Sequence, residues 1–163
     1  MPKIDMATLH IVKGSKYPPP HDAPCAERAL RRLGQAGRLR DFGVNIMTLP
    51  PGSWSTQRHW HSLEDEFVYV LEGTVTLVED GGETELRPGE CAAFPKGTRN
   101  GHHLINKSGA NAVFLEVGSR HQRDVSTCSD IDVMRSNAGG GFVHKDGKPY
   151  PKPEVSPPPK VTA

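Results

Sequence analysis

The 163-residue sequence has no excess of charge of either sign, with 20 basic residues against 19 acidic ones. Domains that bind nucleic acid or an anionic membrane surface usually carry a strong basic excess on one face. Long apolar runs are missing too, and none comes near the roughly 20 residues that a membrane-spanning helix requires. We therefore expect neither nucleic acid nor a membrane among the partners of this chain.

Cysteine is scarce, and its spacing suggests no shared site. Cys25, Cys91 and Cys128 lie far apart, and none belongs to a CxxC pair of the kind found in zinc knuckles and redox motifs. The N-terminal residues also lack the basic stretch followed by an apolar one that marks a signal peptide. Both observations favour a cytoplasmic protein with free thiols. Cys91 is expected to be a small buried side chain on a strand.

Helical patterns are equally rare. Only residues 25–33, CAERALRRL, place apolar side chains at helical spacing, and we expect a short helix there. Proline-rich stretches at 15–24 and 148–163 predict extended, poorly packed segments. The last dozen residues are expected to hang free or to lie across a partner subunit.

The two-residue period of β-strands is abundant, by contrast, from residue 41 to residue 118. Short segments rich in β-branched and aromatic residues, such as EFVYVLEG and GTVTLVEDGG, are separated by turn residues about every 8 to 12 positions. We predict one all-β domain with a barrel over 41–135. Residues 1–40 are then an N-terminal extension, and 136–163 are a C-terminal extension with a proline-rich tail.

The stretch QRHWHSLEDEF concentrates titratable side chains directly before an apolar strand. Alternate residues of a strand share a face, so His59 and His61 point to one side and Trp60 to the other. Glu66 begins the next strand and is expected to face the barrel interior. A buried carboxylate and two imidazoles are costly to desolvate unless they are paired. We therefore predict that His59, His61 and Glu66 bind one metal ion.

A fourth ligand is expected from the segment FPKGTRNGHHLIN. It offers His102 and His103, whose side chains face opposite sides of a regular strand. His102 shares the parity of Leu104 and Asn106. The residues by themselves leave the choice between the two histidines open, because a bulge in this segment would exchange their faces.

Two spaced motifs in this region resemble those of the cupin superfamily. The first cupin motif reads G-x5-H-x-H-x3,4-E-x6-G. It is matched here by Gly52, His59, His61, Glu66 and Gly73, with one extra residue after Gly52.

The second cupin motif reads G-x5-P-x-G-x2-H-x3-N. It is matched by Gly89, Pro95, Gly97, His102 and Asn106, with two extra residues before the histidine. The insertion falls in a turn, where length is tolerated. The match selects His102 as the ligand, and strand alternation then turns His103 outward, to the surface or the rim.

The resemblance, over about residues 43–118, implies a small cupin jelly roll, or double-stranded β-helix barrel, with a metal in its mouth. The ligands carried over from the family are His59, His61, Glu66 and His102. Three imidazoles and one carboxylate suit zinc, iron, nickel, manganese or cobalt, and the sequence does not choose between them. An octahedral ion held by four ligands keeps two open positions for a substrate or dioxygen.

Three charged neighbours of the motifs are interpreted differently. Glu64 and Asp65 are typical of solvated turn residues. Arg58 has the opposite parity to the two histidines, so it is expected to face outward or to pair with an acid.

Three functions are compatible with such a centre. Small single-domain cupins with this ligand set resemble sugar phosphate isomerases, in which a metal binds adjacent substrate oxygens and an acid/base residue moves a proton between carbons. Glu116 is the candidate for that residue. The alternatives are an iron-dependent dioxygenase and a non-catalytic module that binds a small ligand. A homodimer is expected, because small cupins commonly pair and a lone barrel leaves sheet edges open.

Overall fold

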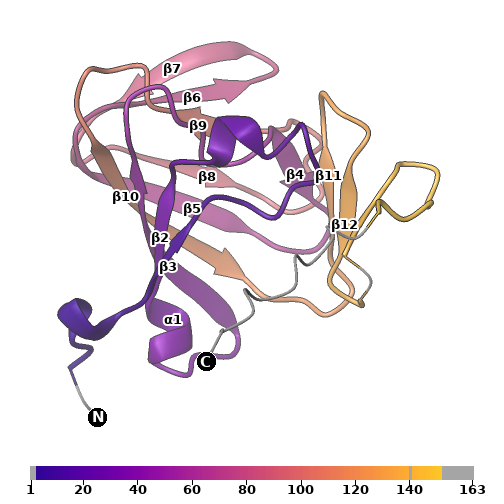
Figure 1. Ribbon diagram of the computed structural model, residues 1–163, viewed down its shortest axis with the longest axis horizontal. Helices are drawn as coiled ribbons and strands as arrows, with labels where there is room; N and C mark the ends of the chain where they lie inside the picture. The colour runs from indigo at the N-terminus through magenta and orange to yellow at the C-terminus, as the bar shows by residue number, and fades with distance from the viewer. Residues whose placement is uncertain (1–2, 140, 152–163) are drawn as a thin grey trace, which may run out of the picture.

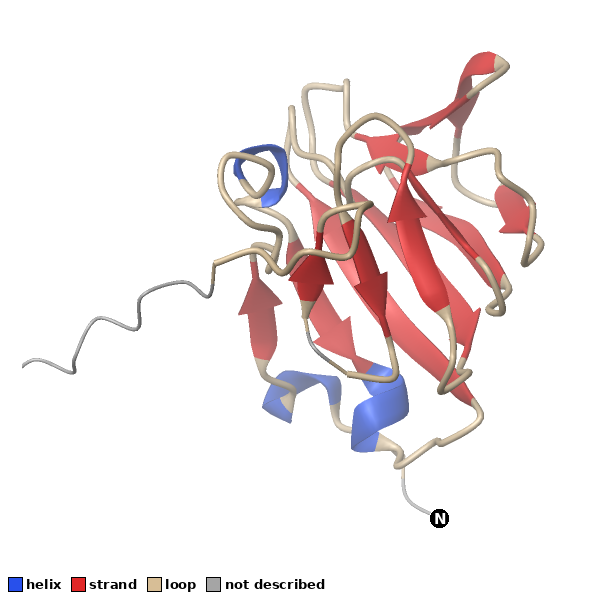
Figure 2. Cartoon of the chain, turned by 90° about the vertical axis from the view of Figure 1, so that its right-hand side faces the viewer, coloured by secondary structure: helices blue, strands red, loops and turns tan. Residues whose placement is uncertain are grey.

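The computed structural model describes residues 3–139 and 141–151, and nearly all of its regular structure is β-strand (Figure 1, Figure 2). This confirms the predicted all-β class. Within these residues no helix has the length and apolar character needed to cross a membrane. The expectation of a free or partner-bound tail over the last dozen residues lies outside the described ranges.

The larger of the sheets has six antiparallel strands. In spatial order they are β1 (Ile11–Lys13), β2 (Ala29–Arg32), β3 (Phe42–Leu49), β10 (Ala112–Ser119), β5 (Glu66–Glu72) and β8 (Cys91–Phe94). The two outermost strands at one edge come from the N-terminal extension. The proposed limits of the barrel and its extensions stay a prediction, but residues 1–40 do contribute strands to this sheet.

Two smaller sheets form the opposite layer. One contains β7 (Gly82–Leu86), β6 (Val75–Glu79) and β9 (His103–Ile105), and the other contains β13 (Phe142–Val143), β12 (Met134–Ser136), β11 (Val125–Cys128) and β4 (His59–His61). An antiparallel bridge between His59 and His102 connects them. The two small sheets therefore act as one layer across from the six-stranded sheet.

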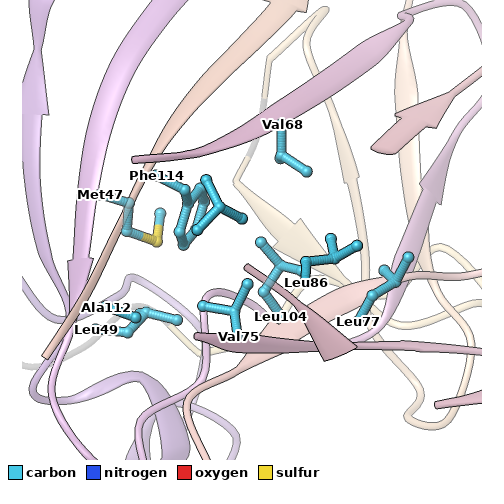
Figure 3. Close-up of a cluster of buried hydrophobic side chains, with 10 residues drawn as sticks. Met47, Leu49, Val68, Val75, Leu77, Leu86, Leu104, Ala112 and Phe114 are labelled. Atoms are coloured by element: carbon cyan, nitrogen blue, oxygen red, sulfur yellow. The ribbon is translucent and has the colours of Figure 1, made fainter. Parts of the chain in front are cut away.

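The apolar core fills the space between these layers (Figure 3). On β5 the alternation is regular, with Val68 and Val70 buried and Phe67 and Tyr69 exposed. The core side chains come from both layers: Met47, Leu49, Val68, Val70, Val75, Leu77, Leu86, Leu104, Ala112 and Phe114. Glu66 shares the inward parity of Val68, so the strand itself directs this carboxylate into the barrel.

The helix expected over residues 25–33 is wrong. Ala29–Arg32 form β2, which pairs with β3, and Leu30 packs against the core. The only α-helix in the described residues is the short α1 (Leu33–Ala36), and two 3-10 turns lie at η1 (Met6–Thr8) and η2 (Ala23–Cys25). Pairing with an open sheet edge and burial of Leu30 outweigh the weak helical propensity of this stretch.

Gly73, the last residue of the first motif, has a structural role. Its φ is +67°, and a side chain there would collide with the carbonyl oxygen of Asn111. Glycine is therefore required where β5 turns into β6.

The outer face of the six-stranded sheet carries several exposed apolar side chains. Phe42, Phe67, Tyr69 and Leu71 are all exposed on it. Cys91 lies there too, directly opposite Tyr69 in the β5–β8 register, so the expectation that it is buried is wrong. Inward and outward positions on β8 are fixed by its pairing with β5, which places Ala92 and not Cys91 over the core.

We predict that the chain forms a homodimer through this outer face, because large exposed apolar patches usually mark interaction surfaces. The double variant Phe67→Glu/Leu71→Glu should convert the dimer into a monomer of 17.8 kDa in sedimentation velocity. Thr84→Glu, on the exposed strand β7, serves as the control and should stay dimeric. A wild-type monomer at micromolar concentration would contradict the prediction.

Candidate metal centre

Backbone pairing explains how two distant histidines meet. The His59 N–H donates to the carbonyl oxygen of His102 at 3.1 Å, and the His102 N–H donates back at 2.9 Å. Directly opposed residues of an antiparallel pair point to the same side. His61 lies two residues beyond His59, so all three imidazoles face the barrel interior, as strand parity predicts.

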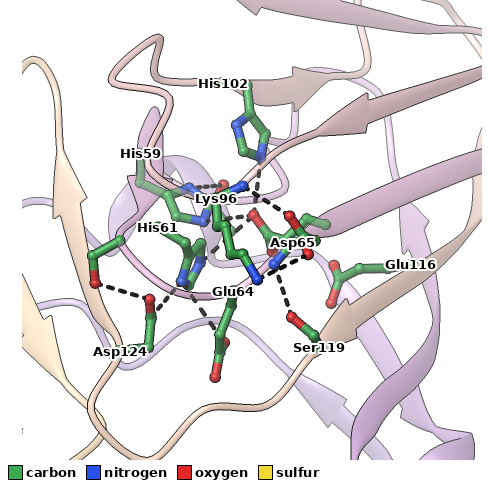
Figure 4. A network of polar contacts seen from close by, with 12 residues as sticks. His59, His61, Glu64, Asp65, Lys96, His102, Glu116, Ser119 and Asp124 are labelled. Carbon is green, nitrogen blue, oxygen red and sulfur yellow. Dashed lines mark hydrogen bonds and ion pairs between the residues drawn. The ribbon is translucent and has the colours of Figure 1, made fainter.

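The side chains of these histidines converge on one carboxylate oxygen (Figure 4). Oε2 of Glu66 lies 3.0 Å from Nε2 of His102 and 3.5 Å from Nε2 of both His59 and His61. Ligand atoms of His59, His61 and Glu66 all lie within 4.8 Å of one another. The structure thus brings together the four residues that the two motifs select.

The pKa shifts within the cluster follow from burial opposed by pairing. Burial alone would raise the pKa of Glu66, but hydrogen bonds and charge from His102, His59 and His61 hold it well below its usual range. Burial would lower the pKa of His59, but Glu66 raises it overall. Burial dominates at His102 and lowers its pKa. Glu66 is therefore held as a carboxylate by hydrogen bonds and positive charge from the imidazoles around it.

In two of the imidazoles, the ring nitrogen that faces away from Glu66 has a hydrogen-bond partner. His59 Nδ1 donates to the carbonyl oxygen of Gln57 at 3.0 Å, and His61 Nδ1 lies 2.6 Å from Oδ2 of Asp124. Nδ1 of His102, by contrast, is buried without a hydrogen-bond partner among the described residues, while its ring stacks on Phe94 at 3.5 Å. His59 and His61 are thus held with Nδ1 as the donor and Nε2 directed inward. His102 is positioned instead by its stacking on Phe94 and by the hydrogen bond between its Nε2 and Glu66.

Asp124 is a site residue that the sequence interpretation missed. Its side chain is 1% exposed, and Oδ1 accepts from the backbone N–H of Leu63 at 2.8 Å and from Ser62 Oγ at 3.2 Å. Burial would raise the pKa of Asp124, but the hydrogen bonds from His61 and Leu63 keep it below its usual range. Asp124 lies well beyond both motifs, so no spacing in the sequence points to it.

Glu64 is also part of the site, which corrects its interpretation as a solvated turn residue. The carboxyl group is half-buried and lies 3.8 Å from His61 Nδ1. One oxygen accepts from the backbone N–H of His121 and from the Asn137 amide. Burial raises its pKa. Glu64 has the parity of Glu66, which is the one signal in the sequence that could have identified it.

Arg58 confirms the expectation that it pairs with acids. Its guanidinium group donates to Asp130 at 2.6 and 2.8 Å, contacts Asp80, and reaches the carbonyl oxygen of Gly101 at 3.4 Å. At Gly101 any side chain would collide with Ser129. These contacts fasten the loop before His102 to the segment after β11, outside the ligand cluster.

His103 faces away from the ligands, but it is not a surface or rim residue as expected. It is 4% exposed, because residues 53–56 cover the outer side of β9. Nδ1 donates to the carbonyl oxygen of Thr56 at 3.0 Å, and the ring meets Trp54 edge-on at 4.6 Å. Burial lowers the pKa of His103, so it is a neutral packing residue.

Glu116 lies on β10 and is directed toward the ligand cluster (Figure 4). Its carboxyl group accepts a hydrogen bond from the Asn45 amide at 2.9 Å. Burial, reinforced by the nearby charge of Glu66, raises its pKa. A carboxyl group with a raised pKa, adjacent to the cluster but outside it, can carry a proton.

Comparisons with known proteins agree with this fold. Residues 45–118 match the cupin domain family. A sugar phosphate isomerase of the cupin superfamily from Silicibacter pomeroyi is 44% identical, with a TM-score of 0.86 over 92% of this chain and 97% of that one. The chain therefore belongs to the cupin superfamily.

Two further relatives are more distant. A structure from Acidithiobacillus ferrooxidans, described as a candidate sugar phosphate isomerase, is 31% identical with a TM-score of 0.67, covering 73% of this chain and 77% of that one. The tetracenomycin polyketide synthase protein TcmJ from Streptomyces glaucescens is 27% identical over 144 residues, which are 88% of this chain and 84% of TcmJ.

Removal of the buried His103 should cost stability that removal of an exposed histidine does not. His103→Ala should lower the free energy of unfolding by about 1–3 kcal/mol, because a buried hydrogen bond and an aromatic contact are lost. His10→Ala, at an exposed position, should change it by less than about 0.5 kcal/mol. Urea denaturation measures both. Equal stability of the two variants would contradict the packing role of His103.

Proposed function

We propose that the protein binds one divalent transition metal ion through His59, His61, Glu66 and His102. The support is the convergence of three imidazole nitrogens on one carboxylate oxygen at 3.0 to 3.5 Å. Such a set of borderline ligands suits zinc, iron, nickel, manganese or cobalt. The ionised carboxylate of Glu66 needs a positive charge beside it. A bound metal ion supplies that charge, so that no imidazole has to carry an extra proton.

The contacts behind the ligands support the same proposal. In metal sites, the ring nitrogen that does not bind the ion usually donates to a carboxylate or a backbone carbonyl. Asp124 serves this purpose for His61, and the Gln57 carbonyl serves it for His59. Both imidazoles are thus oriented before any ion arrives.

Removal of a ligand should release the metal. His61→Ala should lose at least roughly tenfold in metal affinity, and Asp124→Asn should lose roughly 10- to 100-fold because it orients His61. Competition with a chelator, followed by elemental analysis, measures both. His144→Ala, remote from the cluster and paired with Asp132, is the control and should keep wild-type affinity. Full metal occupancy in His61→Ala would refute the ligand set.

We further propose that this centre catalyses the isomerisation of a sugar or sugar phosphate. The observation that carries this is Glu116, a carboxyl group outside the ligand set that faces the same cavity as Glu66. Interconversion of an aldose and a ketose moves one hydrogen between neighbouring carbons and one proton between their oxygens, without an oxidant. It needs one group that takes up and returns a proton, together with a Lewis acid for the two oxygens, which the bound metal supplies.

The position and environment of Glu116 suit that task. The hydrogen bond from Asn45 fixes one carboxyl oxygen of Glu116, and the residue lines the cavity. Burial raises the pKa of Glu116 toward neutral pH, and a group that carries protons is most effective when its pKa is near the pH at which the enzyme works. The similarity to the isomerase from Silicibacter pomeroyi supports the same reaction class.

The test of this proposal is proton exchange. With metal-loaded protein and a panel of aldose and ketose phosphates in D2O, the wild type should incorporate solvent deuterium at the carbon next to the carbonyl. Glu116→Gln should lower that rate by roughly 10²- to 10⁴-fold, the usual contribution of a general base. Its metal content should be unchanged, because Glu116 is not a ligand. Oxygen uptake without isomerisation would instead favour a dioxygenase.

A further inference from the structure

The strand register arranges polar side chains in rows at one end of the barrel interior. Asn45 pairs with Arg32 on one side and with Glu116 on the other. The next row pairs Gly43 with Gly118, and Gly118 with Glu66. Asn45 and Glu116 have the parity of the core residues on their strands, so both rows face inward, above the apolar core.

In the second row, Gly43 and Gly118 place no side chains next to Glu66. Neither has a positive φ. A Cβ on Gly43 would come no closer than 3.7 Å to another atom, and one on Gly118 no closer than 3.6 Å. These are ordinary contacts, so the fold does not require glycine at either position. What the pair provides is an opening, the Gly43–Gly118 cleft, with a volume of about 300 Å³ and Glu66 and Glu116 in its wall.

This cleft reaches the ligand cluster at Glu66, and it is roomier than a second hollow that Glu66 also lines. The hollow on the other side of Glu66, next to Trp60 and His102, has a volume of only about 40 Å³. The Gly43–Gly118 cleft, in contrast, reaches the lower end of the range of small-molecule sites, about 300–1,000 Å³.

The mouth of the cleft is lined by two arginines. Arg120 donates from Nη1 to the carbonyl oxygen of Leu39 at 3.1 Å, and its guanidinium group lies over Gly43. Arg32, the last residue of β2, lies in the row of Asn45. Within residues 3–139 and 141–151, neither arginine forms an ion pair. Exposed guanidinium donors with no acidic partner, at the entrance to a cavity, suit an oxyanion.

The residues in the wall of the cleft determine which chemical groups the inner part of a ligand can carry. Glu64, Glu66 and Glu116 all line it, and carboxylate groups would repel an anion placed among them. Hydroxyl groups, however, can donate to carboxylates and accept from the Asn45 amide. The charge gradient along the cleft therefore orients a ligand with its anion outward and its hydroxyl groups inward.

We propose that the Gly43–Gly118 cleft is the substrate subsite of the metal centre and takes a small hydroxylated anion. Its phosphate or carboxylate group binds Arg32 and Arg120, and its hydroxyl end lies toward Glu66 and Glu116. This inference rests on the proposed metal-dependent function and adds the entry side and the anionic character of the substrate.

The test uses three probes that share a hydroxylated three-carbon skeleton and differ in the group at one end: glycerol 3-phosphate, glycerate and glycerol. Each is titrated into zinc-loaded protein, and the amide signals of Gly43 and Gly118 are followed by NMR. We expect one or both anions to shift these signals with saturation, and glycerol to bind at least roughly tenfold more weakly. The two anion arms distinguish a phosphate ligand from a carboxylate ligand. Binding of neither anion, or equal binding of glycerol, would overturn the proposal.

Variants locate the subsite. The double variant Arg32→Ala/Arg120→Ala should weaken anion binding roughly tenfold or more and leave glycerol binding unchanged. Gly43→Ala/Gly118→Ala should weaken all three probes, because two methyl groups narrow the cleft. Arg87→Ala, on the remote β7 side and paired with Glu85, is the matched control and should bind like the wild type. Unchanged anion affinity in the arginine variant would refute the subsite.

Zinc stoichiometry separates this proposal from the one on which it rests. All these variants should keep one zinc per chain, which also reports that they fold. If the wild type holds no zinc, the metal proposal fails, and the same titrations on metal-free protein still decide whether Arg32 and Arg120 bind the anion.

Discussion

The pair of backbone hydrogen bonds between His59 and His102 is the constraint on which the rest of the structure depends. It connects the two small sheets into one layer, and it sets two imidazoles side by side on the inner face of that layer. Neighbouring contacts hold the two segments of this bridge in place. Arg58 ties the neighbouring loop to Asp130, and Gly101 allows Ser129 to approach closely just before His102. Displacement of either segment would separate ligands that side-chain rotation alone could not bring back together.

The barrel interior is polar at one end and apolar at the other, and the change occurs along individual strands. On β5 the inward positions run from Glu66 to Val68 and Val70, and on β10 from Glu116 to Phe114 and Ala112. Apolar burial at one end thus holds carboxyl groups in place at the other. A buried carboxylate without a partner costs several kcal/mol, so Glu66 is tolerated only because three imidazoles surround it. The same arrangement that makes the site costly also prepares it for a cation.

The sequence was informative wherever a local rule decides the outcome. Motif spacing and strand parity were enough to bring His59, His61, Glu66 and His102 together, and the two residues inserted before His102 are absorbed in the turn without a change of face. The failures share a different cause. The helix expected over residues 25–33 was replaced by a strand because an open sheet edge was available, and His103 is buried because residues 53–56 cross over β9. Asp124 reaches His61 only through the pairing of β11 with β4. Such contacts depend on tertiary placement, which no single window of sequence contains.

The two layers divide the work of the site. The small sheets and the segment leading into β9 supply the three imidazoles. The six-stranded sheet supplies Glu66, Glu116 and Arg32, and Arg120 directly follows its strand β10. Arg32 comes from β2, in the N-terminal extension, outside the segment that matches the cupin domain. Relatives as different by name as a sugar phosphate isomerase and a polyketide synthase protein are similar to this chain, and a fold alone does not select a substrate. A change at the sheet edge can alter what enters the cleft while the ligand cluster stays intact, because no metal ligand lies on β2 or β3. Substrate choice in this chain is therefore expected to reside in the strands that flank the cleft, and metal binding in the two motifs.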